Sequence, residues 1–98
     1  MLINEQNYKV FPIDDDSVGL AKSQDFKLII EKELKSGNIL LAFDFSKLNS
    51  INSAGLGVLI GILRKVKEAK GSLKLLNLND RVLNIFKITK LDTLFDIN

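Results

Sequence analysis

The stretch ILLAFDF, from Ile39 to Phe45, decides the fold of this chain. It lies between Gly37 and Ser46, which makes it too short for a helix, and it is apolar at successive positions until Asp44. A short apolar run without alternation is typical of a strand that is covered on both faces. We therefore expect this stretch to form a strand in the middle of a sheet.

The segments on either side of this strand have helical periodicity. From Ser23 onward, apolar residues recur at the spacing of one helix face, and Gly37 is placed to end the segment. The same spacing returns from Gly55 to Lys70, with Gly71 placed to cap its end. The apolar faces consist of Phe26, Ile29, Ile30 and Leu34 in the first segment and of Leu56, Leu59, Leu63 and Val66 in the second. Both segments are predicted to be amphipathic helices.

Shorter elements are expected at both ends of the chain. Tyr8–Ile13 has the composition of a strand, and Pro12, which cannot donate a ladder hydrogen bond, is expected to confine that strand to an edge or to end it. Ser72–Leu78 is expected to form the next strand, Asp80 to cap a short third helix, and the LFDI sequence at Leu94–Ile97 to form a last short strand.

The alternation of strands and helices predicts a single α/β domain over residues 1–98. We expect a mostly parallel or mixed sheet of about four to five strands, with about three to four helices and right-handed crossovers.

The composition narrows the possible functions. The chain has 14 basic and 12 acidic residues, and a net charge of +2 is too small to imply a nucleic-acid partner without a clustered patch. Cysteine and histidine are absent, which excludes disulfides, thiolate chemistry and an imidazole base. The chain shows neither a signal-peptide pattern nor an uncharged apolar run of about 18 residues. We expect a cytoplasmic protein with no cofactor, no nucleic-acid partner and no direct membrane insertion.

Three motifs resemble functional sites but fit simpler roles. The acidic run Asp14–Asp16 opens a predicted turn (Asp14–Leu20) and lacks the spacing of a calcium loop, so we expect solvated carboxylates and no metal site. The basic stretch Arg64–Lys70 contains apolar and acidic interruptions and is expected to be the solvent face of a helix. The glycines of the second helical segment do not have the spacing of a phosphate-binding loop, and they are expected to let a strand or a partner approach that helix closely. These glycines are Gly55, Gly57 and Gly61.

Ser53 lies where the second helix is expected to begin, and two interpretations of it are open. In the first, Ser53 or the neighbouring Asn52 is the helix N-cap. In the second, Ser53 is a site of modification, because a hydroxyl at a helix N-terminus, at the carboxyl end of a parallel sheet, lies where α/β proteins expose functional loops. The positive end of the helix dipole would tolerate an added phosphate, whereas the surface of a binding partner would not.

The stretch from Asp44 to Ile97 resembles the anti-sigma factor antagonists, small STAS-domain proteins of bacterial partner-switching systems. The family motif Asp-Ser-(Ser/Thr/Ala)-Gly-Leu-Gly is matched here by Asn52, Ser53, Ala54, Gly55, Leu56 and Gly57. The sequences GSLKLLNLNDRV and FKITKLDTLFDI extend the match. The resemblance implies that these motif residues bind a partner and that Ser53 is the phosphorylation site.

The same resemblance implies a switch and no catalytic residues. The unmodified protein would bind an anti-sigma factor serine kinase and so release the sigma factor; phosphorylation of Ser53 would end this binding, and a phosphoserine phosphatase would restore it. Two features depart from the family: Asn52 replaces the aspartate, which removes a carboxylate beside the acceptor, and PIDDDSVGLAKS stands where the family has Gly-Glu-(Leu/Ile)-Asp.

The sequence leaves two other functional classes to compare with this one. One is a non-catalytic STAS scaffold or an accessory subunit of a transporter, in which Ser53 is only a helix cap. The other is an enzyme of flavodoxin-like or thioredoxin-like type, which the absence of a C-x-x-C motif and of a convincing cofactor loop disfavours.

Overall fold

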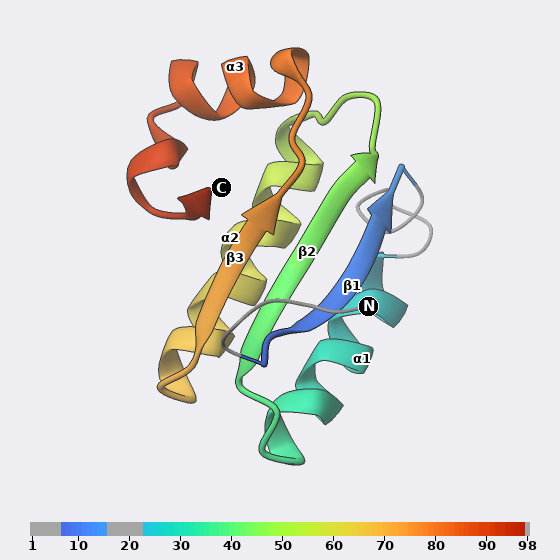
Figure 1. The fold of residues 1–98 in the computed structure, drawn as a ribbon, viewed down its shortest axis with the longest axis vertical. Coiled ribbons are helices and arrows are strands. Elements are labelled where there is room, and N and C mark those ends of the chain that lie inside the picture. Colours follow the sequence, from blue (N-terminus) through green and yellow to red (C-terminus); the bar gives the residue numbers. More distant parts are fainter. Residues whose placement is uncertain (1–6, 16–22, 98) are drawn as a thin grey trace.

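The computed structural model describes residues 7–15 and 23–97, which form one parallel sheet with helices packed on it (Figure 1). The elements, in chain order, are β1 (Lys9–Asp14), α1 (Ser23–Lys35), β2 (Leu40–Lys47), α2 (Ser53–Glu68), β3 (Ser72–Leu76), α3 (Asp80–Ile88), the 3-10 helix η1 (Leu91–Thr93) and β4 (Asp96–Ile97). The sheet order is β1-β2-β3-β4, and all three neighbouring pairs are parallel. The expected fold class is therefore confirmed, with four parallel strands and three α-helices.

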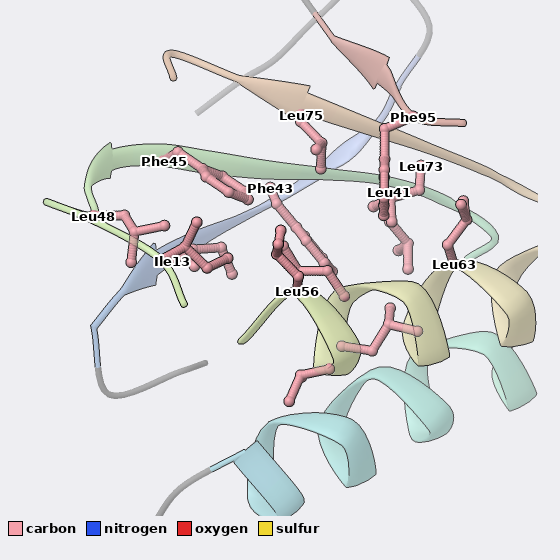
Figure 2. Packing of buried hydrophobic residues seen from close by; sticks show 14 of the residues in the cluster. Ile13, Leu41, Phe43, Phe45, Leu48, Leu56, Leu63, Leu73, Leu75 and Phe95 are labelled. Carbon is pink, nitrogen blue, oxygen red and sulfur yellow. The ribbon is translucent and has the colours of Figure 1, made fainter. Parts of the chain in front are cut away.

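Strand β2 is central, as the sequence predicts, but the helices do not cover it on both faces. Leu41, Phe43 and Phe45 are fully buried and point toward the helical layer (Figure 2). Helices α1 and α2 lie on that same face (Figure 1). On the opposite face Ala42 is buried, whereas Asp44 is only partly buried. Within the described residues the second face is thus buried at Ala42 but is not covered by α1 or α2, so the expectation of a strand covered on two sides is met only in part.

Strand β1 lies at the edge of the sheet, as the proline predicts. Pro12 is exposed, and within residues 7–15 and 23–97 β1 pairs only with β2. The register shifts between Pro12 and Asp14. A residue that cannot donate a ladder hydrogen bond is accommodated at an edge or an irregularity, and here it has both. The predicted turn at Asp14–Leu20 cannot be compared, because residues 16–22 lie outside the described residues.

The two long helices bury the expected faces with one exception. In α1, Phe26 and Ile30 are buried, but Ile29 is 49% exposed, so its assignment to the core is wrong. Ile29 lies about 100° around the helix from Ile30, so its side chain lies outside the narrow buried face of α1. Helix α2 buries all four predicted residues and also Val58 and Ile62. Its buried face is wider because α2 packs against the sheet and against α1.

The ends of these elements differ from the predictions by one or two residues. Helix α2 begins at Ser53 rather than Gly55, and β3 ends at Leu76, where Asn77 adopts a left-handed conformation with φ of 61°. The N-cap of α3 is Asn79 instead of Asp80, and its side-chain oxygen accepts the backbone N–H of Val82 at 2.8 Å. Asparagine and aspartate are equally good N-caps, so the sequence could not separate these neighbours.

Two glycines act at helix C-termini in different ways. Gly37 has φ of 94° and ends α1 as predicted. After α2 the left-handed residue is Lys70, with φ of 61°, and the N–H of Gly71 bonds the carbonyl of Val66 at 2.9 Å. A Cβ on Gly71 would overlap the carbonyl oxygen of Ile39. Gly71 is therefore required by a close approach of backbone, in addition to its predicted role at the helix end.

Candidate phosphorylation site

Ser53 follows the loop 48–52, which joins β2 to α2 at the carboxyl end of the sheet. Leu48 and Ile51 are buried in the core and anchor this loop, while Asn49 and Ser50 are exposed. The N–H of Leu48 also bonds the carbonyl of Phe45 at 2.9 Å, which closes a turn directly after the strand. The location expected for Ser53, after a strand and at the carboxyl end of a parallel sheet, is confirmed.

The N-cap of α2 is Asn52, which leaves the Ser53 hydroxyl without a structural role in capping. The Asn52 side-chain oxygen accepts the N–H of Gly55 at 2.9 Å, and the Asn52 carbonyl accepts the N–H of Leu56 at 2.9 Å. Ser53 is the first helical residue and is exposed, and its hydroxyl forms no hydrogen bond within residues 7–15 and 23–97. Of the two cap candidates, Ser53 is thus the wrong one.

The start of α2 can accept negative charge. Its first turn contains no acidic residue, and the backbone N–H groups of Ser53 and Ala54 have no acceptor among the described residues. These donors lie at the positive end of the helix dipole. A phosphate on Ser53 could therefore be stabilised by the helix that carries it.

The remaining motif residues divide between the surface and the core. Ala54 and Gly57 are exposed, whereas Gly55 and Leu56 are buried. Apart from the backbone of α2 itself and the neighbouring residues, no described atom lies within 4 Å of a Cβ built on Gly57 or on Gly61. No described strand approaches either glycine, so the expectation of a close strand is wrong for these two residues. Asn52, Ser53, Ala54 and Gly57 thus form an exposed strip that we call the α2 entry surface.

Two side chains that the sequence did not single out for this role hold the loop before Ser53. Asn79 donates through Nδ2 to the carbonyl of Leu48 at 3.1 Å and to the carbonyl of Asn49 at 3.3 Å. On the other side, Asp15 accepts the backbone N–H of Asn49 at 3.4 Å and its Nδ2 at 3.5 Å. Asp15, Asn49 and Asn79 each follow a strand of the parallel sheet, and the carboxyl ends of parallel strands lie at the same edge. From the sequence, their proximity could have been predicted on this ground alone.

The charged motifs of the sequence lie apart from Ser53 or have partners of their own. Among the described residues no group of three or more acidic, histidine or cysteine side chains could hold a metal ion, and Asp16 lies outside them. Arg64, Lys65 and Lys67 are exposed on α2, as predicted for a solvent face. Lys65 bonds Glu31 of α1 at 2.8 Å, and this contact lowers the pKa of the Glu31 carboxyl.

Asp44 of β2 orders the start of the connection between β3 and α3. Its Oδ1 accepts Nδ2 of Asn77 and the backbone N–H of Ser46, each at 3.0 Å. The hydrogen bond from Asn77 holds the pKa of the Asp44 carboxyl below its usual value; the Ser46 N–H adds to this effect and partial burial opposes it. Asp44 therefore stays charged to lower pH than an ordinary aspartate.

Comparison with known proteins relates the chain to a family. The STAS domain family matches residues 6–98. An anti-sigma-B factor antagonist of Bacillus subtilis is 46% identical over 48 residues, which are 49% of this chain and 44% of that protein. The anti-sigma-B factor antagonist of Listeria monocytogenes is 32% identical over 65 residues, which are 66% of this chain and 56% of that protein. The matched stretches thus span about half the length of these relatives. Both relatives are named for antagonism of an anti-sigma factor, and neither name describes a catalysed reaction.

Solved structures show the same fold. TM1081 of Thermotoga maritima superimposes with a TM-score of 0.79 at 24% identity, covering 100% of this chain and 83% of that protein. The phosphorylated form of the Bacillus cell fate determinant SpoIIAA gives a TM-score of 0.60 at 19% identity, covering 91% of this chain and 77% of that protein.

Within residues 7–15 and 23–97, no helix combines the length and the apolar character that crossing a membrane requires.

Proposed function

The chain belongs to the STAS domain family, and on this premise we propose that it is an anti-sigma factor antagonist controlled by phosphorylation of Ser53. Residues 1–98 act as a single cytoplasmic STAS domain. The unmodified form binds an anti-sigma factor that is a serine kinase, and the sigma factor is released. Phosphorylation of Ser53 ends this binding, and a phosphoserine phosphatase restores it.

The exposed hydroxyl of Ser53 is the observation that carries this proposal. Asn52 already caps α2, so Ser53 is not needed for capping, and its hydroxyl has no hydrogen-bond partner in the described part of the chain. A serine that is exposed at a helix N-terminus, free of structural hydrogen bonds and close to unused backbone donors, suits an acceptor that must be modified without unfolding the domain.

The chemistry of the switch needs only the serine of this chain. The Ser53 Oγ attacks the γ-phosphorus of ATP, the bond to the β-phosphate bridging oxygen breaks, and ADP leaves while the hydroxyl proton passes to a base of the kinase or to water. The phosphatase reverses the modification by hydrolysis: water attacks phosphorus, and Ser53 and inorganic phosphate are formed. The new group carries about −1.5 to −2 charges at neutral pH.

The α2 entry surface suits a partner that comes close to the helix backbone. Ala54 and Gly57 present little or no side chain, and the space beside Gly57 is open. A partner packed against these residues would surround the unmodified hydroxyl of Ser53. A phosphate at that position would lose its hydration and would repel any acidic group of the partner, so the complex would dissociate.

Labelling with the cognate kinase and ATP, followed by mass spectrometry, tests the acceptor. We expect phosphate on Ser53 and no label in Ser53→Ala. Ser50→Ala is the matched control, because Ser50 is exposed in the loop that precedes Ser53. This control should be labelled like the unmodified sequence. Label that stays on the Ser53→Ala protein would reject Ser53 as the acceptor.

Calorimetry against the anti-sigma factor tests the recognition half of the proposal. Ser53→Ala should bind about as tightly as the natural sequence, whereas Ser53→Asp should bind more weakly because a carboxylate imitates part of the phosphate charge. Equal affinity of both variants, together with label on another residue, would leave Ser53 as an ordinary first helical residue. A scaffold or transporter accessory would then be the better assignment.

A further inference from the structure

We propose that Asn79 is a positioning residue for Ser53, and that its side-chain amide presents the acceptor loop to the kinase. The proposal rests on the function proposed above and adds a determinant that lies outside the family motif. Asn79 precedes α3 and is separated from Ser53 in sequence by α2 and β3. Its effect on Ser53 passes through the backbone of the loop 48–52.

Both ends of the Asn79 amide are used. Oδ1 accepts the N–H of Val82 at 2.8 Å, which caps α3, and Nδ2 donates to the carbonyls of Leu48 and Asn49 at 3.1 and 3.3 Å. The orientation of the amide follows from its surroundings, since a backbone N–H needs an acceptor and two carbonyls need donors. One side chain thus joins the start of α3 to the loop that leads into α2.

This double contact explains why the residue is asparagine. Aspartate and serine cap a helix as well as asparagine does, but neither supplies the two amide hydrogens that the carbonyls of Leu48 and Asn49 accept. Asn52, which caps α2, provides a comparison within the chain. Its Nδ2 has no hydrogen bond within residues 7–15 and 23–97, so at that position only the capping oxygen is used.

The loop has few other restraints on its exposed side. Leu48 and Ile51 anchor it in the core, but Asn49 and Ser50 between them are exposed. The contacts of Asn49 with Asp15 are at the limit of hydrogen-bond length, at 3.4 and 3.5 Å. The shorter bonds from Asn79 therefore contribute most to fixing the backbone just before Asn52 and Ser53.

Loss of the Nδ2 donors should let the loop open without unfolding the domain. Two neutral hydrogen bonds of ordinary net strength correspond to about a thirtyfold change in the equilibrium between the closed and the open loop. A kinase that binds the closed loop would then show a higher KM for this protein, while kcat for the bound acceptor stays near its original value.

Asn79→Asp and Asn79→Ser test the proposal, because both keep a capping oxygen and lack the amide donors. Asn84→Asp is the matched control: Asn84 is exposed on the same helix, and its side chain has no hydrogen-bonding partner among the described residues. Amide hydrogen exchange followed by NMR would report the loop through the hydrogen-bonded amides of Leu48 and Asn49, and it would report the start of α3 separately. Labelling kinetics with the kinase would give KM and kcat for each variant.

We expect exchange in the loop to rise about thirtyfold in both Asn79 variants, with the Val82 amide still protected and KM raised by a similar factor. Asn84→Asp should change neither quantity. Loop exchange equal to that of the natural sequence in both Asn79 variants, or an unchanged KM, would overturn the proposal. A parallel rise in the loop and throughout α3 would also overturn it, because that result indicates loss of the cap. The proposed function has its own test, because it is rejected if the kinase does not label Ser53 of the natural sequence. In that case the exchange comparison still shows whether Asn79 holds the loop.

Discussion

Gly57→Ala should stabilise the fold and weaken partner binding, and these opposite signs make it a sharp test of the α2 entry surface. Gly57 lies inside α2 and is exposed, and no described atom outside the nearby α2 backbone lies within 4 Å of the position that a Cβ would occupy. The methyl group therefore meets no steric cost. What remains is the helix propensity of alanine over glycine, about 0.8–1 kcal/mol in a helix interior. For a domain of this size, that gain corresponds to a rise in Tm of about 4–8 °C.

A glycine elsewhere in the chain serves as the contrast. Gly71→Ala would place its Cβ against the carbonyl oxygen of Ile39 and at 2.8 Å from the Ile39 Cβ. Overlap of this kind costs about 1–3 kcal/mol, because the backbone must shift to relieve it. The two substitutions are chemically identical, so their opposite effects on stability would reflect the local geometry alone.

The assay combines denaturation and binding. Urea unfolding followed by circular dichroism gives the free energy of unfolding of both variants, and calorimetry gives their affinity for the anti-sigma factor. Gly57→Ala should be the more stable and the weaker binder. A loss of stability in Gly57→Ala would refute the reasoning about open space at that position. Unchanged affinity in a stabilised variant would remove Gly57 from the partner surface.

Three further predictions concern the core, the charged groups and the cap of α2. Leu63→Ala should lower the free energy of unfolding by about 2–5 kcal/mol in urea denaturation, because Leu63 is 8% exposed and packs in the core cluster; a loss below about 1 kcal/mol would contradict this packing. The lowered pKa of the Asp44 carboxyl means that its contribution to stability is fully present above the ordinary aspartate pKa and is lost as the pH falls through the lower value of the folded state. Asn77→Gly keeps the left-handed turn, removes the donor, and should raise the pKa of Asp44 in an NMR titration; an unchanged value would reject the Asn77 hydrogen bond as the main cause. Asn52→Asp should leave the free energy of unfolding within about 0.5 kcal/mol or raise it, because aspartate is an equally good N-cap and suits the helix dipole; a clear loss in denaturation would contradict the capping role of Asn52.

The layered fold follows closely from the sequence, because the periodic apolar pattern is set by burial. The buried stripe of α2 follows from a helical period that continues over many residues. The central position of β2 follows from an unbroken apolar run, and the edge position of β1 follows from Pro12. Ile29 shows the limit of this reasoning. Whether a residue at the margin of a stripe is buried depends on the neighbouring element, which in α1 leaves Ile29 half exposed.

The site could be predicted only in part. The position of Ser53 follows from the helix start, but the choice between Ser53 and Asn52 as cap depends on a shift of one residue, and both residue types cap well. The contacts of Asn79 and Asp15 with the loop 48–52 depend on how strands and loops distant in sequence meet. No local pattern encodes such contacts, since they are set by the register of the sheet.

The most direct test of the proposed switch is the affinity of the anti-sigma factor for the protein before and after phosphorylation of Ser53, measured by calorimetry on material whose modification is confirmed by mass spectrometry. The structure leads us to expect a folded domain in both states, because α2 can accept the added charge at its N-terminus. Tight binding of the unmodified protein and loss of binding on phosphorylation, with recovery after phosphatase treatment, is the predicted result. Equal affinity of the two forms would contradict the account.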